Sequence, residues 1–236
     1  MSDSPIVVVT GRPGAGKGTQ SELLAARLAV PVVDLGQRLR AESLKSTLFG
    51  EILARLPPGQ YAPDEVAEAI LIEGLREARQ HSRGLILDGY PRFRWQVERL
   101  DGLLGSRRVD AVIHIDADIE TCATRLQERV SCLVCGKTAP KNRSALTDLC
   151  AECGGELTRR ADDNIAALRA RLATYEVNMG EVLSTYTERG LLSRVDGVGS
   201  EAAVEARIAA AVSAGHELNE SLQRGHVAQI SLFGEI

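Results

Sequence analysis

Residues 6–19 read Ile6-Val7-Val8-Val9-Thr10-Gly11-Arg12-Pro13-Gly14-Ala15-Gly16-Lys17-Gly18-Thr19. An apolar run is followed here by a stretch that fits G-x-x-x-x-G-K, with the hydroxyl displaced by one residue and a helical pattern beginning at the lysine. Glycines let successive backbone N–H groups converge, a helix N-terminus adds positive potential, and a lysine can reach the phosphates. A tight turn alone would need neither the fixed glycines nor the lysine. The stretch therefore predicts a phosphate-binding loop, with Thr19 or a water molecule facing Mg²⁺.

The rest of the chain alternates short apolar runs with longer helical patterns. The runs lie at residues 6–9, 30–33, 85–87, 109–115 and 191–195. Between them, apolar residues recur at three- and four-residue spacings over 17–28, 63–78, 95–104, 119–129, 164–188 and 201–214. Continuous β-branched runs are typical of parallel strands buried on both faces. The pattern predicts an α/β fold, a doubly wound parallel five-stranded sheet with helices on both faces.

Two segments interrupt this alternation. Residues 35–72 are too long for a simple crossover, and residues 130–163 are rich in Cys, Gly and Thr. We interpret both as insertions that cover the carboxyl edge of the sheet. The core is then expected at 1–34, 73–129 and 164–215, and residues 216–236 are expected to form a C-terminal tail.

The composition limits the possible partners. The formal net charge is −4, so no overall basic field attracts nucleic acid or an anionic membrane surface. The apolar run near the start is far shorter than a membrane span or a signal-peptide core, and no basic region precedes it. We expect a cytoplasmic protein without nucleic-acid or membrane partners.

Four of the five cysteines form two C-x-x-C pairs, Cys132 with Cys135 and Cys150 with Cys153. Two such knuckles can supply four thiolates to one Zn²⁺ in tetrahedral geometry, leaving no open position, so the predicted role of the metal is structural. A pair of disulfides, a redox dithiol and a nucleic-acid-binding zinc ribbon are the alternatives. The expected reducing compartment disfavours the disulfides, and the presence of two knuckles disfavours the dithiol. Residues 125–171 contain nine basic and six acidic residues, and this small excess of positive charge disfavours a nucleic-acid-binding zinc ribbon.

Three motifs, in this order, resemble the adenylate kinases. They are Gly11 to Gln20, then Leu87-Asp88-Gly89-Tyr90-Pro91-Arg92 with Gln96, then Arg160-Ala161-Asp162-Asp163 with Arg171. The resemblance covers about residues 5–214. It implies an ATP-dependent nucleoside monophosphate kinase that converts ATP and AMP into two ADP by direct in-line transfer with Mg²⁺. It also makes 35–72 the acceptor-binding insertion and 130–163 the lid over the triphosphate, and we expect a monomer.

The resemblance also implies roles for individual residues. For ATP it implies Gly14, Ala15, Gly16, Lys17, Gly18, Thr19, Arg125 and Arg129, and for the acceptor nucleotide Leu35, Arg40, Gly89, Arg92, Gln96, Arg160 and Arg171. The resemblance implies that Asp88 orients Mg²⁺ through water. It implies catalytic roles for Lys17, Asp88, Arg92, Arg129, Arg160 and Arg171. The spacing itself predicts that Arg125 and Arg129 share one helical face and that Arg160 and Arg171 lie three turns apart on the next helix.

At one place the chain departs from the family pattern. Where adenylate kinases usually have Ser-Thr-Gly-Asp before two residues and Arg, this chain has Asp34-Leu35-Gly36-Gln37-Arg38-Leu39-Arg40. Leu35 replaces a threonine hydroxyl that helps to read adenine, and such a polar contact changes discrimination by about 1–3 kcal/mol. The acceptor base stays open between AMP and CMP, UMP, GMP or a deoxynucleotide. A nucleotide-sensing relative that binds ATP without transfer is the alternative from another class.

Overall fold

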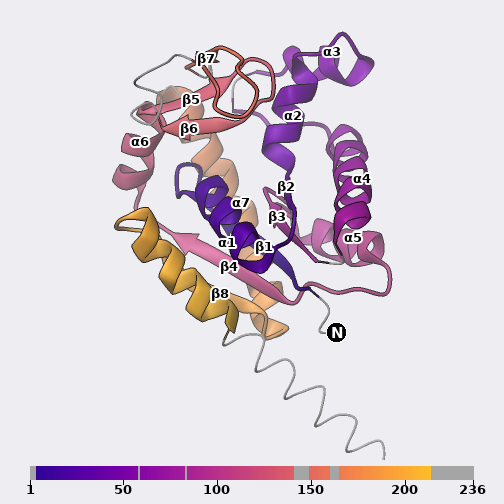
Figure 1. Cartoon of the computed structure of the whole chain (residues 1–236), viewed down its shortest axis with the longest axis vertical. Helices are drawn as coiled ribbons and strands as arrows, with labels where there is room; N and C mark the ends of the chain where they lie inside the picture. The colour runs from indigo at the N-terminus through magenta and orange to yellow at the C-terminus, as the bar shows by residue number, and fades with distance from the viewer. Residues whose placement is uncertain (1–3, 58, 83, 141–148, 160–164, 214–236) are drawn as a thin grey trace, which may run out of the picture.

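The computed structural model describes residues 4–57, 59–82, 84–140, 149–159 and 165–213. At its centre lies a parallel five-stranded sheet with the strand order β2-β3-β1-β4-β8 (Figure 1). Its strands are β1 (Ile6–Gly11), β2 (Val32–Asp34), β3 (Leu85–Asp88), β4 (Ala111–Asp116) and β8 (Leu192–Asp196). Each strand overlaps one of the five apolar runs, so the predicted doubly wound α/β sheet is confirmed.

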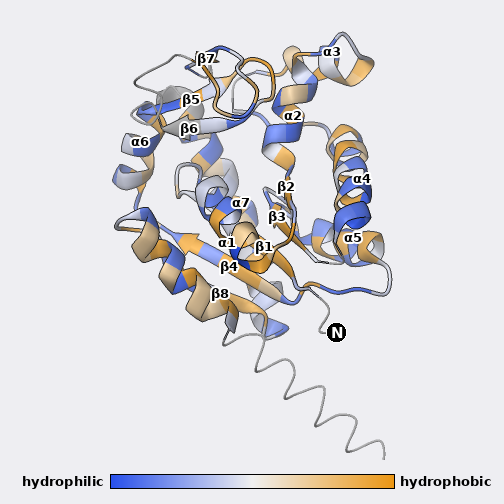
Figure 2. Cartoon of the chain, in the orientation of Figure 1, coloured by the Kyte–Doolittle hydropathy of each residue, from blue (hydrophilic) through white to orange (hydrophobic). Residues whose placement is uncertain are grey.

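The sheet is buried on both faces because apolar residues of β1 alternate between two clusters. Ile6 and Val8 belong to the first cluster, and Val7 and Val9 belong to the second. Side chains of α4 (Asp64–His81), α5 (Arg94–Leu104) and α7 (Ile165–Glu188) complete the first, and those of α1 (Lys17–Leu28) and of a helix over residues 201–213 complete the second. Figure 2 shows hydrophobic residues concentrated on the central strands and mixed with polar ones on α4.

Two segments lie beyond the sheet and stand together at one end of the molecule (Figure 1). After β2 the chain forms α2 (Leu35–Ser43) and α3 (Leu48–Ala54) before entering α4. After α6 (Ile119–Gln127) it forms a small antiparallel sheet with the order β6-β5-β7, built from β5 (Arg129–Cys132), β6 (Thr138–Pro140) and β7 (Leu157–Thr158). The predicted boundary between insertion and core, at residue 72, lies inside α4, which continues unbroken past it. The division into core, insertion and lid therefore stays a prediction.

The structure corrects one prediction about side-chain placement. Arg125 and Arg129 do not share a helical face, because α6 ends at Gln127 and Arg129 is the first residue of β5. Antiparallel pairing of Arg129 with Pro140 holds the chain extended there. A periodic apolar pattern cannot show that a pairing partner eleven residues later ends the helix, and this is why the spacing was misleading.

Some predictions fall outside the described residues. Arg160, with the two carboxylates that follow it, and the tail 216–236 belong to them. Among the helices that the structure describes, none is both long and apolar enough to span a membrane.

Candidate functional site

A cavity of about 350 Å³ lies where the loop after β1, the end of β3 and the small antiparallel sheet meet. Six cationic side chains line it, against four carboxylates. The cations are Lys17, Arg40, Arg92, Arg125, Arg129 and Arg171, and the acids are Asp34, Asp88, Glu128 and Glu201. The whole chain carries a net charge of −4, so this excess of positive charge is local. Such a cavity is suited to a polyanionic ligand.

Most of the predicted site residues meet in this cavity although they come from distant parts of the chain. In addition to the six cations and Asp88, the lining includes Gly14, Ala15, Gly16, Gly18, Thr19 and Gly89. Leu35 and Gln96 are not among the lining residues. Both are buried, Leu35 within the first apolar cluster, while its chain neighbours Asp34 and Gly36 line the cavity.

The loop between β1 and α1 has the conformation that its glycines permit. Gly14 and Gly16 have φ values of 88° and 99°, in the region where residues with a Cβ are strained. A Cβ on Gly14 would lie only 2.4 Å from the carbonyl oxygen of Cys122. Gly16 is the N-cap of α1, so the helix N-terminus opens onto the cavity and adds positive potential there.

Lys17, which is partly exposed, and Asp88, which is buried, are oppositely charged neighbours in the site. The Lys17 ammonium donates to the carbonyl oxygens of Gly11 at 2.9 Å and Arg12 at 3.0 Å. Burial, with the positive charge of Arg92, Arg171 and Arg129 nearby, lowers the pKa of Lys17. Burial and the neighbouring Asp34 raise the pKa of Asp88, although Lys17 and Arg92 oppose this. Binding of an anion beside Lys17, or of a cation beside Asp88, would therefore favour the charged form of that group.

The guanidinium of Arg92 is held from two directions. Its Nε donates to the carbonyl oxygen of Gly89 at 2.8 Å, and its Cζ lies 4.5 Å from the ring centroid of Tyr61. Gln96 fixes the backbone here, since its Oε1 accepts from the Arg92 N–H at 2.7 Å and its Nε2 donates to Asp64 at 3.2 Å. The glycine at position 89 has φ 84°, which turns the chain after β3 toward the cavity.

Arg125 connects the phosphate loop to the segment that follows β8. Its Nη1 donates to the carbonyl oxygen of Ala15 at 3.1 Å, and its Nη2 donates to that of Gly197 at 2.9 Å. Gly197, Gly199, Glu201 and Val204 also line the cavity, and the sequence analysis did not single them out. The sequence did contain a signal for them, since Gly197 and Gly199 follow a predicted parallel strand and ligands of open α/β sheets bind at that edge.

Arg12 is a further residue whose role was not predicted from the sequence. It stands in the phosphate loop, but its side chain points away from the cavity lining and forms ion pairs with Asp116 at 2.9 Å and Glu176 at 2.8 Å. Asp116 ends β4, and Glu176 lies on α7, the helix that also carries Arg171. Arg12 therefore joins the phosphate loop to the element that brings Arg171 to the cavity.

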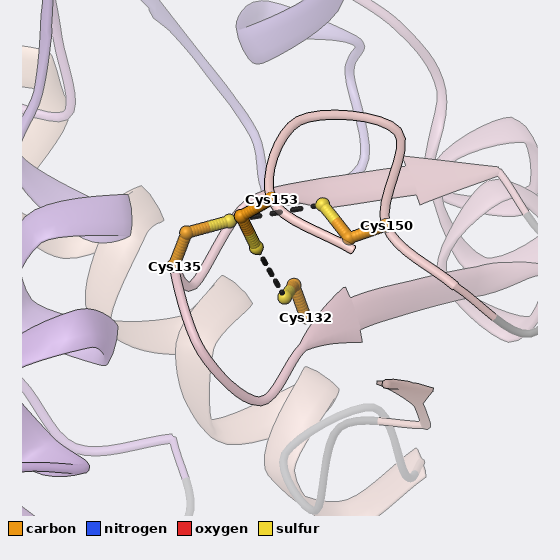
Figure 3. A group of neighbouring side chains, drawn as sticks. All are labelled: Cys132, Cys135, Cys150 and Cys153. Atoms are coloured by element: carbon orange, nitrogen blue, oxygen red, sulfur yellow. Dashed lines mark hydrogen bonds between the residues drawn. The ribbon is translucent and has the colours of Figure 1, made fainter. Parts of the chain in front are cut away.

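The four cysteines of the two knuckles lie together, as predicted (Figure 3). All four Sγ atoms are within 4.8 Å of one another, and the cysteines are free thiols. The closest pairs are Cys132 with Cys153 at 3.4 Å and Cys135 with Cys150 at 3.7 Å. Tetrahedral Zn²⁺ with bonds of about 2.3 Å requires sulfur atoms about 3.8 Å apart, so the cluster fits a four-thiolate zinc site. All four positions are filled by protein, which suits a structural metal.

Comparison with known proteins agrees with this geometry. The family model described as adenylate kinase matches residues 9–191. The adenylate kinase of Novosphingobium aromaticivorans is 37% identical over 214 residues, covering 86% of this chain and 99% of the relative. That of Syntrophobacter fumaroxidans is 36% identical over 213 residues, covering 86% and 98%. That of Syntrophotalea carbinolica is 34% identical over 214 residues, covering 89% and 99%. The chain therefore belongs to the adenylate kinase family.

Proposed function

We propose that the protein transfers the terminal phosphoryl group of ATP to AMP, giving two ADP. It is a phosphotransferase with a phosphate group as acceptor, as its family is, and it uses Mg²⁺ with ATP. The observation that carries the assignment of the site is the convergence of Lys17 with arginines from α2, the β3 edge, β5 and α7 in one cavity. Simple ATP binding needs a phosphate loop, whereas transfer to a second nucleotide needs further fixed cations beside it.

The proposed roles of the cations are supported by their presence around one cavity. The backbone of residues 14–19 and Lys17 bind the donor phosphates, and Arg125 flanks the donor nucleotide beside the end of β8. Arg92, held by Gly89 and Tyr61, faces the acceptor phosphate together with Arg40. Arg129 and Arg171 line the same cavity near Lys17, and their proposed role is to neutralise charge on the transferring phosphoryl group. The proposed transfer is direct and in line, with both nucleotides bound at once, and it needs no covalent enzyme intermediate.

Asp88 is the carboxylate best placed to act with Mg²⁺. It is 4% exposed at the carboxyl end of β3, beside Lys17 and Gly18. A carboxylate in this position can orient the water ligands of the metal, because Mg²⁺ retains several waters when it is bound to phosphates. Positive charge on the metal would favour the ionised form of Asp88.

The acceptor base is the open part of this proposal. Leu35 is 3% exposed and packs within the first apolar cluster, so it offers the base pocket no hydroxyl. Gln96, the other candidate for reading the base, already accepts from the N–H of Arg92 and donates to Asp64. The family membership favours AMP, and preference for another monophosphate is the alternative that the altered segment motivates.

The test is diphosphate formation from Mg·ATP with AMP, CMP, UMP, GMP and dAMP offered separately. We expect AMP to give the highest kcat/KM. A higher kcat/KM with another acceptor would show that the protein prefers a different base. ATP binding with no transfer to any of the five would refute the kinase assignment and favour a sensing protein.

A further inference from the structure

The first cysteine knuckle lies against α2, the helix that carries Arg40. The Nε2 of Gln37 donates to the carbonyl oxygen of Cys135 at 3.3 Å, and the Nε of Arg40 donates to that of Gly136 at 2.9 Å. Figure 1 shows the β5–β6 end of the small sheet beside α2. Two segments almost a hundred residues apart are thus joined through the backbone carbonyls of a predicted metal ligand, Cys135, and of the residue that follows it.

The contact is close enough to require glycine at position 136. Gly136 is buried and has φ 67°. A Cβ placed on it would lie 2.7 Å from the carbonyl oxygen of Gln37, 2.9 Å from the backbone nitrogen of Ala41 and 3.1 Å from Cβ of Arg40. The first two atoms belong to the backbone of a regular helix and cannot turn aside as a flexible side chain can. Any larger residue would therefore push the knuckle and α2 apart.

The knuckle is also fixed to the rest of the molecule, and this holds the Gly136 carbonyl in place. Lys137 forms ion pairs with Glu22 on α1 at 3.1 Å and with Glu152 of the second knuckle at 2.6 Å. Within the turn, the Gly136 N–H donates to the carbonyl oxygen of Cys132 at 3.2 Å. The Gly136 carbonyl therefore has a defined position relative to both the phosphate-loop helix and the cysteine cluster.

We propose that the Cys135–Gly136 segment is a positioning element for the acceptor phosphate, acting through Arg40. Arg40 lines the cavity, and its Nε bond to Gly136 sets the orientation of its planar guanidinium. The inference rests on the proposed function, in which Arg40 faces the acceptor. It gives the cysteine site a role beyond folding a small segment, because the turn that it shapes also orients a binding residue of another segment.

The second knuckle supplies a matched control. Gly154 follows Cys153 as Gly136 follows Cys135, and its φ of 72° is nearly the same. A Cβ on Gly154 would meet nothing within 4 Å. Alanine at either position carries a similar backbone penalty because the two φ values are nearly equal, so a difference between the two variants isolates the contact with α2.

The experiment compares Gly136→Ala, Gly154→Ala and wild type after elemental analysis has shown equal zinc content. Equilibrium binding of AMP, the KM values for AMP and ATP, and hydrogen exchange of residues 35–43 are measured. We expect Gly136→Ala to weaken AMP binding and raise its KM by at least about fivefold, to change the KM for ATP by less than about twofold, and to speed exchange in α2. Gly154→Ala should stay close to wild type in all four. Gln37→Ala, which leaves the knuckle intact, should weaken AMP binding by about two- to threefold. This variant tests the same contact if Gly136→Ala loses zinc.

Equal AMP binding and equal exchange in the two glycine variants would overturn the inference. Because binding is measured apart from turnover, its failure can be told from failure of the proposed function. A wild-type protein that binds AMP without transferring phosphate would refute the kinase assignment, and the two glycine variants would still decide the role of the knuckle. A wild type that binds no nucleoside monophosphate would refute both.

Discussion

His114 should make the protein less stable in mild acid, by an amount that its surroundings determine. It lies in the middle of β4, 4% exposed, with its Nδ1 3.4 Å from the hydroxyl of Tyr175. The neighbouring strands place Thr10 and Arg194 beside it in register. Burial, then the positive charge of Arg194, lowers the pKa of His114 from 6.5 to about 4, with Asp116 opposing.

The sign follows from proton binding in the two states. Between the unfolded and folded pKa values the unfolded chain binds a proton at this residue and the native state does not, so stability is lost as pH falls through this range. For a folded pKa of about 4 against 6.5 in the unfolded chain, moving from about pH 7.5 to about pH 5 costs about 2 kcal/mol. That is a large part of the stability of an ordinary domain.

The assay is urea unfolding of wild type and His114→Asn at both pH values. Other groups titrate in the same range, Asp88 among them, so the quantity to read is the difference between the two proteins. We expect wild type to lose about 2 kcal/mol more than His114→Asn on acidification. His81→Gln is the control, since His81 is exposed near the end of α4, and it should behave as wild type does. Equal losses in His114→Asn and wild type would refute the argument that burial holds this imidazole neutral.

Three further predictions concern the site and the lid. Lys17→Ala should lower kcat by at least about a hundredfold with the fold intact by circular dichroism, and near wild-type turnover would remove Lys17 from the mechanism. The kcat/KM for Mg·ATP should rise with pH as Asp88 ionises, at a pH above the usual carboxyl range because its pKa is raised, and Asp88→Asn should lack this limb. At high pH it should fall as Lys17 loses its proton, earlier than an ordinary lysine would. Removing zinc, or Cys150→Ser, should lower the melting temperature while kcat at saturating substrates changes by less than about threefold, and elemental analysis that finds no metal would contradict the zinc assignment.

The sequence was sufficient for those parts of the fold that depend on local pattern. Helix α1 has the predicted bounds, 17–28, because the glycine loop fixes its start and the apolar spacing continues to its end. The five strands were recognisable since a strand buried on both faces must be apolar throughout. The cysteine cluster was equally accessible, because the two-residue spacing within each knuckle already brings a pair of thiolates to one side of a turn.

Features that depend on contacts between distant segments could not be predicted in this way. The break between α6 and β5 depends on pairing with β6, and the ion pairs of Arg12 depend on where α7 packs. Nothing in the sequence distinguishes the glycine at position 136 from other glycines that follow a cysteine. Only the position of α2 shows that its missing side chain leaves room for another helix.

The arrangement of charge in the cavity connects these observations. Six cations gathered around four carboxylates repel one another, and this repulsion adds to burial in lowering the pKa of Lys17. Other groups hold four of the six in place: carbonyl oxygens for Lys17, Gly89 and Tyr61 for Arg92, Ala15 and Gly197 for Arg125, and Gly136 for Arg40. Bound phosphates relieve the repulsion without any need to reorient the donors, and this preorganisation is what electrostatic stabilisation of a phosphoryl transfer requires. The residues that hold the arginines therefore contribute to function as much as the arginines do, although none of them carries charge.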